Sequence, residues 1–331
     1  MRNSIGALAT QRYQRPPVRS GARPQDGPRA ARATLRPVEP LLLITNSEAG
    51  SNDEENLDQA LAVLRAATDV EVAATSNQGE LDGVLHRRGG RHVVVAGGDG
   101  SLHAVIAALH RRNELADTVV GLVPLGTGND FARGAGIPLD PEDSARLIVE
   151  GTVQPVDLIV DCLGEVVVNN VHVGVGAQAS HNAKNLKKVL GRAGYVLGAL
   201  KAAVKPPFVR LRIEVDDHVV ADFAHPILMV AIGNGSRVGG GAAITPEADP
   251  GDGRMDVMVS FSTTLWAKAG YAVRFRRGTH HERDDVLYVH GTSVTISGQD
   301  FYCSADGELY GPERNRTWRL EPGAFSMPLP H

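Results

Sequence analysis

The chain has 331 residues, of which 42% are apolar and 22% are charged, as is usual for a folded globular protein. Its two cysteines, Cys162 and Cys303, exclude a disulfide framework and favour a reduced, cytosolic setting. No stretch reaches the ~18 apolar residues that span a bilayer, so any membrane contact is expected to be peripheral. The overall charge of −4 is distributed unevenly.

The first 40 residues form a basic tail. They contain eight arginines against Asp26 and Glu39, a net charge of +6, which leaves −10 on the remainder. The tail is rich in proline and lacks apolar periodicity, so residues 1–38 are expected to be disordered. Such a tail can contact anionic lipid or nucleic acid, but a solvated extension is favoured and no nucleic-acid partner is predicted.

From residue 39 to residue 152, apolar strands alternate with amphipathic helices. Strands are predicted at the short apolar runs 40–44, 70–72, 92–96 and 119–123. Helical spacing of apolar residues is clearest after the third run, where Leu102, Val105, Ile106 and Leu109 fall on one face. The alternation predicts a parallel sheet that binds its ligands at the carboxyl ends of the strands.

Beyond residue 152 strand-like runs follow one another. They lie at 156–160, 166–169, 209–215, 227–232, 255–261, 286–289 and 293–296. Only residues 181–204 interrupt them with a helical pattern. This half is therefore expected to be a mainly antiparallel β-sandwich.

The first motif with a chemical meaning is Gly97-Gly98-Asp99-Gly100-Ser101, between an apolar strand and an amphipathic helix. Glycines let backbone N–H groups approach phosphate oxygens, and a helix N-terminus favours an anion. Asp99 is placed to reach a nucleotide-bound Mg²⁺, directly or through water. The alternative is a plain strand–helix turn in which Ser101 caps the helix.

A second glycine motif, Leu125-Gly126-Thr127-Gly128-Asn129-Asp130, follows the next apolar strand. Thr127 offers a hydroxyl and Asn129 an amide to a phosphate or a ribose. For Asp130, capping of the following helix and a catalytic role are equally compatible with the sequence. Two such loops at neighbouring strand ends predict nucleotide binding more strongly than either does alone.

These two motifs, with the segments 234–241, 246–257 and 306–308, resemble the catalytic domain of diacylglycerol kinases and their bacterial lipid-kinase relatives. The resemblance covers about residues 40–330 in the family order. It implies an α/β ATP-binding domain related to NAD kinase and phosphofructokinase (39–152, with 312–330 returning to it). A β-sandwich domain for the lipid substrate (153–311) follows, with ATP in the cleft.

The resemblance also implies residue roles. The residues it associates with ATP are Asn46, Thr75, Gly97, Gly98, Asp99, Gly100, Ser101, His103, Gly126, Thr127, Asn129 and Asp130. This chain departs from the family pattern at His103, where Asn is usual, and in the loop after Asn46, which lacks a proline. Asp306-Gly307-Glu308 matches the general-base segment. Glu308 is the favoured base, with Asp306 as an orienting group or metal ligand and Asp99 as the third catalytic carboxylate.

The segment 249–254 resembles the structural Mg²⁺ loop of the family. Asp249 and Asp252 would supply carboxylate oxygens and Arg254 its carbonyl. The alternative is an acidic turn without a metal. ATP and Mg²⁺ are thus the expected cofactors.

The segment 184–212 carries eight lysines and arginines and no acid, interleaved with apolar residues. Such a segment is typical of one that lies on an anionic bilayer, so a cytoplasmic, peripherally membrane-associated protein is expected. The alternative is a helix with a solvated basic face. Oligomeric state is not encoded in any motif, and a homodimer is compatible with the family.

The predicted function is ATP-dependent phosphorylation of a lipid hydroxyl, with diacylglycerol the leading acceptor and phosphatidic acid its product. Phosphatidylglycerol, a sphingoid base and other polyol lipids stay open as acceptors. Because NAD kinases and phosphofructokinases also use a Gly-Gly-Asp-Gly loop, a kinase for a soluble substrate is the alternative. A second alternative is a catalytically silent regulator that binds lipid or nucleotide.

Overall fold

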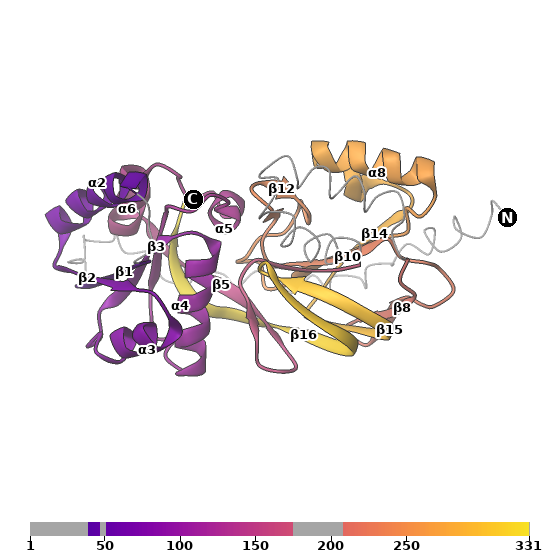
Figure 1. The fold of residues 1–331 in the computed structure, drawn as a ribbon, viewed down its shortest axis with the longest axis horizontal. Coiled ribbons are helices and arrows are strands. Elements are labelled where there is room, and N and C mark those ends of the chain that lie inside the picture. The colour runs from indigo at the N-terminus through magenta and orange to yellow at the C-terminus, as the bar shows by residue number, and fades with distance from the viewer. Residues whose placement is uncertain (1–38, 47–50, 175–207, 331) are drawn as a thin grey trace, which may run out of the picture.

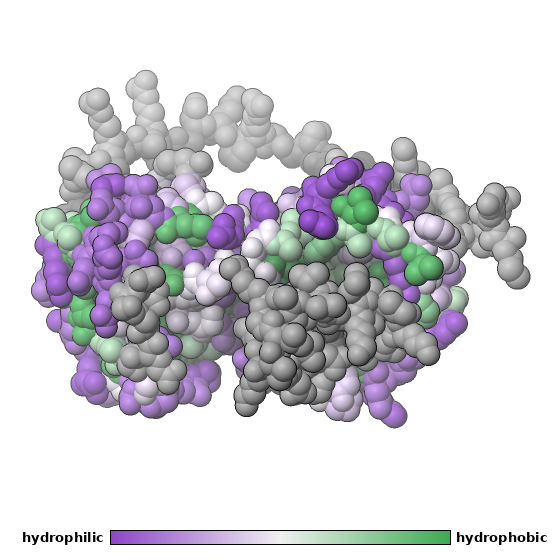
Figure 2. All heavy atoms as spheres, turned by 45° about the horizontal axis from the view of Figure 1, so that its top comes forward, coloured by the Kyte–Doolittle hydropathy of each residue, from purple (hydrophilic) through white to green (hydrophobic). Residues whose placement is uncertain are grey.

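The structure is a computed structural model that describes residues 39–46, 51–174 and 208–330. The predicted disordered tail (1–38) and the helical pattern at 181–204 lie outside the described residues. The chain forms two lobes, a helix-covered sheet at its N-terminal end and a strand-rich lobe at its C-terminal end (Figure 1). The face turned forward in Figure 2 is mostly hydrophilic over the first lobe.

The first lobe contains a four-stranded parallel sheet in the order β2-β1-β3-β4. Its elements are β1 (Leu41–Asn46), α2 (Ser51–Ala67), β2 (Val70–Thr75), α3 (Gln78–His86), β3 (His92–Gly97), α4 (Asp99–Arg111), β4 (Val120–Pro124), α5 (Asp130–Gly134) and α6 (Pro141–Glu150).

Both faces of this sheet are covered by helices, which explains its continuous apolar strands. In β1, Leu41 and Leu43 pack in the core under α2 and α6, whereas Leu42 and Ile44 pack in the core under α3 and α4. Figure 1 shows the two helix pairs on opposite sides of the sheet.

The second lobe is built on a ten-stranded antiparallel sheet with the order β14-β13-β10-β7-β15-β16-β5-β6 and with β8 and β9 branching from β15. Its elements are β5 (Thr152–Asp161), β6 (Val166–Val167), β7 (Asn170–Gly174), β8 (Leu211–Val215), β9 (His218–Ala221), β10 (Met229–Gly233), β11 (Arg237–Val238), β12 (Ala242–Ala243), β13 (Met255–Ser260), α8 (Leu265–Arg277), η1 (His280–Glu282), β14 (Val286–Gly291), β15 (Ser293–Ala305) and β16 (Glu308–Leu329). The predicted fold class, a parallel α/β domain followed by an antiparallel β domain, is confirmed.

Strand β16 links the lobes. Its first half pairs with β15, and its second half pairs with β5 from Trp318 to Leu329. Near its end Ser326 bridges to Val119, beside β4, and Phe325 and Met327 lie in the core of the first lobe. Phe325, Met327 and Leu329 therefore belong to the core of the first lobe, whereas Trp318 and Leu320 lie in the core of the second. The predicted returning segment 312–330 stays a prediction as a domain boundary.

One element of the second lobe differs from the sequence analysis. The only helical pattern expected there was at 181–204, yet residues 265–277 form the 13-residue helix α8. Its inward face is narrow, because Tyr271 and Phe275 pack against the sheet while much of the rest is exposed. Thr264 caps its N-terminus by accepting from the N–H of Ala267.

Candidate active site

The carboxyl edge of the parallel sheet collects the predicted nucleotide residues. β1 ends at Asn46 and β2 at Thr75, and these two residues are partners in the ladder. β3 ends at Gly97, which is aligned with Pro124 at the end of β4. The carboxyl ends of parallel strands meet at one edge, so four distant segments reach the same side of the domain.

The two glycine motifs contact each other backbone to backbone. A Cβ built on Gly126 would lie 2.4 Å from the Cα of Gly98, and one on Gly97 would lie 2.6 Å from the Oγ of Ser101. A Cβ on Gly100 would meet nothing within 4 Å. Glycine is therefore required at the loop contact by packing, whereas Gly100 faces open space that a phosphate can enter.

The N-terminus of α4 has the features of an anion site. Its N-cap is Gly98, with no side-chain hydrogen bond to the cap, so the alternative in which Ser101 caps the helix does not occur. The first backbone N–H groups of a helix have no partner within the helix and favour negative charge. Thr127, on the neighbouring loop, is exposed to solvent.

Asp99 joins the two loops. Its Oδ2 accepts from the N–H of Asp130 and its Oδ1 from the N–H of Phe131, both at 3.0 Å. It therefore caps α5, whose own N-cap Asn129 makes no capping bond. Each oxygen keeps a lone-pair site, so the predicted contact of Asp99 with nucleotide-bound magnesium stays a prediction.

Asn129 and Asp130 have partners within the protein. Asn129 is in the left-handed conformation with φ 51°, and its amide bonds to the N–H and the carbonyl of Gly126. Asp130 is buried and accepts from the N–H groups of Gly240 and Gly241 at 2.6–3.0 Å. Asp130 thus connects the glycine loops to the second lobe instead of capping its own helix.

A short hairpin carries Asp306-Gly307-Glu308 against helix α4 of the first lobe. Ala305 pairs with Glu308, and the two residues between them have φ values of 46° and 87°. Two positive φ values match the two-residue turn that the twist of a hairpin favours. The segment is therefore a hairpin turn. This turn projects into the interface between the lobes.

Asp306 is fully engaged. Its carboxylate accepts from the N–H groups of residues 168, 169 and 170 at 2.7, 3.0 and 3.1 Å, and its Oδ2 lies 2.9 Å from Nδ1 of His103 on α4. Burial alone would lower the pKa of His103, but the hydrogen bond to Asp306 and the charges of Asp306 and Glu308 outweigh it and raise this pKa. Glu308 is exposed at the start of β16.

The predicted metal loop lies against β5, where the N–H of Asp157 donates to the carbonyl of Pro250 at 2.6 Å. Asp249 accepts from the N–H of Gly251, and Asp252 accepts from Nε of Arg254 at 2.7 Å. Over residues 39–46, 51–174 and 208–330, no group of three or more His, Cys, Asp and Glu is arranged to hold a metal ion. A site completed by carbonyls and waters needs fewer carboxylates, so the metal assignment stays a prediction.

Sequence reasoning missed Asp157, which supports this loop from beneath. It is buried and accepts from the N–H groups of Gly253 and Gly323, both at 2.7 Å. Burial raises its pKa first, and the charges of Asp252 and Asp249 raise it further, against the effect of the two hydrogen bonds. Asp157 therefore adds a third negative charge near Asp249 and Asp252. The sequence signal that could have identified Asp157 is an acidic residue within the apolar run 156–160.

The basic segment 184–212 lies mostly outside the described residues. Its two described cations are held by neighbours. Arg210 donates to the carbonyl of Phe223 at 2.6 Å, and Arg212 pairs with Glu214.

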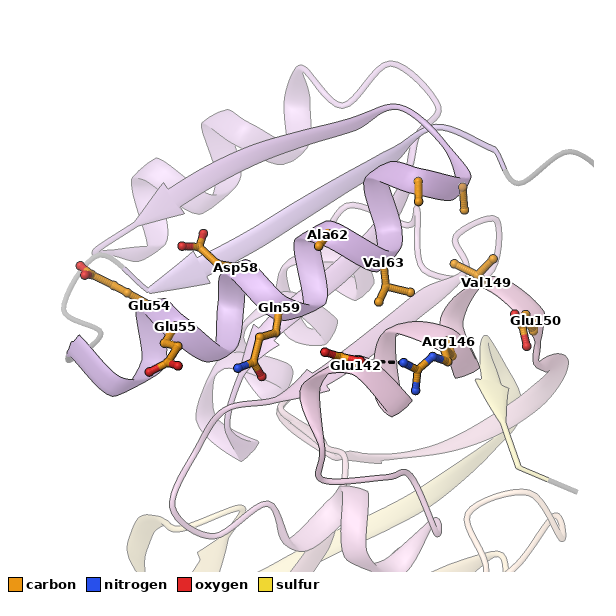
Figure 3. Close-up of a pocket in the computed structure, with 12 residues that line it drawn as sticks. Glu54, Glu55, Asp58, Gln59, Ala62, Val63, Glu142, Arg146, Val149 and Glu150 are labelled. Atoms are coloured by element: carbon orange, nitrogen blue, oxygen red, sulfur yellow. Dashed lines mark hydrogen bonds and ion pairs between the residues drawn. The ribbon is translucent and has the colours of Figure 1, made fainter.

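A groove of about 1120 Å³ runs between α2 and α6 (Figure 3). Glu54, Glu55, Asp58, Glu142 and Glu150 line it, and Glu142 pairs with Arg146 at 2.6 Å. Five carboxylates against one guanidinium repel phosphate groups, so this groove does not fit a nucleotide.

Comparison with known proteins agrees with the geometry. Residues 40–160 match the model of the diacylglycerol kinase catalytic domain, and residues 169–328 match that of the YegS C-terminal NAD kinase beta sandwich-like domain. A Xanthomonas oryzae protein named "Probable lipid kinase YegS-like" is 32% identical over 303 residues, covering 87% of this chain and 96% of its own. A Stenotrophomonas maltophilia protein of the same name is 35% identical, covering 87% and 95%.

A crystal structure of a diacylglycerol kinase from Bacillus anthracis has the same fold. It superimposes with a TM-score of 0.71 at 26% identity and covers 88% of this chain and 97% of its own. A parallel-sheet domain with two glycine loops, followed by an antiparallel domain, is the architecture shared by these proteins. The chain belongs to the diacylglycerol kinase catalytic-domain family, and the relatives described above are of the YegS-like type.

Among the helices that the structure describes, none is long and apolar enough to cross a membrane.

Proposed function

We propose that this protein is an ATP-dependent lipid kinase that transfers the γ-phosphoryl group to a lipid hydroxyl, with diacylglycerol as acceptor and phosphatidic acid as product. One observation carries the proposal. The two glycine loops pack against each other, and the helix that begins at the first loop contacts the Asp306-Gly307-Glu308 hairpin through His103 and Asp306. The names of the relatives, a probable lipid kinase and a diacylglycerol kinase, support a lipid acceptor.

The phosphate groups of ATP are assigned to the loops at 97–101 and 126–130. The N-terminus of α4 offers backbone N–H groups, the open space at Gly100 admits an oxyanion, and Thr127 offers a hydroxyl. Asn46 and Thr75, at the adjacent strand ends, extend the site along the same edge. Bound Mg²⁺ would neutralise charge on the transferring phosphate.

The exposed carboxylate of Glu308 is assigned as the general base. Three backbone N–H groups and His103 already occupy the acceptor sites of Asp306, which makes it a positioning residue for the hairpin. In the transfer, the acceptor oxygen forms a bond to the γ-phosphorus and the bond to the ADP oxygen breaks. The hydroxyl proton moves to the Glu308 carboxylate.

A lipid acceptor lies in a membrane, so the proposal includes a peripheral position at the cytoplasmic face of a bilayer. The basic segment 184–212 is assigned to this contact on its composition. A homodimer is compatible with this arrangement.

The test is transfer of labelled phosphate from ATP, with Mg²⁺, to diacylglycerol, phosphatidylglycerol, sphingosine and ceramide in mixed micelles. NAD and fructose 6-phosphate serve as soluble acceptors. Label in diacylglycerol supports the proposal. Label only in NAD or fructose 6-phosphate would identify a soluble-substrate kinase, and ATP binding without transfer to any acceptor would identify a silent regulator.

A further inference from the structure

Helix α8 has an unusual outward face. Leu265, Trp266 and Val273 are 72%, 85% and 53% exposed, which is exceptional for such side chains on a folded domain. Trp266 and Val273 lie two turns apart on the same side of the helix, with the exposed Ala269 between them. In Figure 2, where the side of the molecule carrying α8 comes forward, hydrophobic and strongly hydrophilic residues lie side by side.

The same helix is strongly basic. It carries Lys268, Arg274, Arg276 and Arg277 and no acid, in a protein whose net charge is negative. Arg274 pairs with Glu282 at 3.7 Å, and Lys268 lies 4.6 Å from the ring centroid of Phe208. Within the part of the chain that the structure describes, neither Arg276 nor Arg277 forms an ion pair.

The basic end of α8 lies beside the loop that contains Gly241. Arg276 and Arg277 line a groove of about 550 Å³ together with Arg237 and Gly241. Gly241 belongs to the loop whose N–H groups bind Asp130. The arginines at the end of α8 therefore lie beside the loop that connects the second lobe to the phosphate loops, whereas Trp266 lies at the opposite end of the helix.

We infer that the outward face of α8, comprising Leu265, Trp266, Val273, Arg276 and Arg277, docks on an anionic membrane surface. Tryptophan and leucine insert at the boundary between headgroups and acyl chains, and arginines attract anionic headgroups. A second copy of this chain fits the face poorly, because two copies of the face would bring four arginines together. The reason for docking, which is to reach a hydroxyl acceptor held in the bilayer, rests on the proposed function. The test of docking does not depend on that function.

Sedimentation of the full chain with vesicles, without nucleotide, tests the docking surface. Vesicles of phosphatidylcholine with phosphatidylglycerol are expected to bind the protein, and more strongly at low salt, whereas phosphatidylcholine alone binds weakly. The double variant Leu265→Ser/Trp266→Ser should lose about tenfold or more in vesicle affinity. The variant Arg276→Gln/Arg277→Gln should lose about fivefold or more on anionic vesicles only. The control Leu163→Ser, which removes a side chain that is 70% exposed in the β5–β6 turn, should bind like the wild type.

Fluorescence gives a second measurement. The chain has two tryptophans, and Trp318 is 1% exposed in the core, so a change of emission with vesicles reports Trp266. A shift to shorter wavelength that disappears in Trp266→Ser supports docking. Wild-type protein that does not bind anionic vesicles, or α8 variants that bind equally well, would overturn the inference. Failure of phosphate transfer to every lipid would refute the proposed function while leaving this binding result readable.

Discussion

The imidazole Nδ1 of His103 and the carboxylate Oδ2 of Asp306 lie 2.9 Å apart, although 203 positions separate the two residues. His103 belongs to the helix that begins at the first phosphate loop, and Asp306 belongs to the hairpin that carries Glu308. This contact fixes the distance between the nucleotide loops and the proposed base. We therefore expect the side chain of His103 to position the hairpin.

The His103–Asp306 contact predicts a dependence of stability on pH. The pKa of His103 is raised in the folded protein, so its stabilisation is complete below the ordinary value of 6.5 and is lost as pH rises through the raised pKa. Thermal unfolding of the wild type and of His103→Asn measures this. The wild type should be more stable by about 1 kcal/mol at pH 6, and the difference should shrink towards pH 8. A difference that is constant over this range would contradict the assignment.

The contact between the glycine loops predicts opposite outcomes for two similar substitutions. Gly126→Ala places a methyl group 2.4 Å from the Cα of Gly98, so it should lower the unfolding temperature and weaken ATP binding about tenfold or more. Gly100→Ala meets no atom within 4 Å and should keep or raise the unfolding temperature, because alanine favours helix. Calorimetry with and without ATP measures both. Equal unfolding temperatures for the two variants would refute the packing argument.

The bonds from Asp130 to the loop at 240–241 predict coupling between the lobes. In Asp130→Asn an amide replaces the carboxylate that accepts from Gly240 and Gly241, so about 1–2 kcal/mol of stability should be lost. Amide hydrogen exchange should rise at both ends of this contact. Asp117→Asn, at an exposed turn, is the matched control and should change neither quantity. If the amides of residues 239–241 in Asp130→Asn were as protected from hydrogen exchange as those in the wild type, a connecting role for Asp130 would be contradicted.

The carboxylates around residues 249–252 predict a response to Mg²⁺. The pKa of Asp157 is raised on folding, so the folded protein loses stability as pH rises through the raised pKa of this carboxyl group. A bound cation would offset the repulsion between Asp157, Asp249 and Asp252. Millimolar Mg²⁺ should therefore raise the unfolding temperature more at pH 7 than at pH 4.5. The effect should vanish in Asp249→Asn/Asp252→Asn and persist in Asp284→Asn. An equal rise in all three proteins would assign the effect to unspecific binding.

The fold class was predictable because each strand and each glycine motif is a local pattern. Alternating strands and helices required a parallel sheet, and Gly98 and Gly126 were identified from their motifs alone. The partners of Asp130 and Asp306 were not predictable, because they are backbone N–H groups of segments more than a hundred positions away. Helix α8 escaped detection for a physical reason, since Trp266 and Val273 place apolar residues on its solvent face and obscure the usual two-sided pattern.

The most direct test of the account measures transfer of labelled phosphate from ATP to diacylglycerol by the wild type and by Glu308→Gln, with ATP binding measured in parallel. The account predicts labelled phosphatidic acid with the wild type, a loss of about a hundredfold or more in Glu308→Gln, and equal ATP affinity in both. Unchanged transfer by Glu308→Gln would show that this carboxylate does not accept the proton. Absence of label in any lipid with the wild type would contradict the assignment of a lipid kinase.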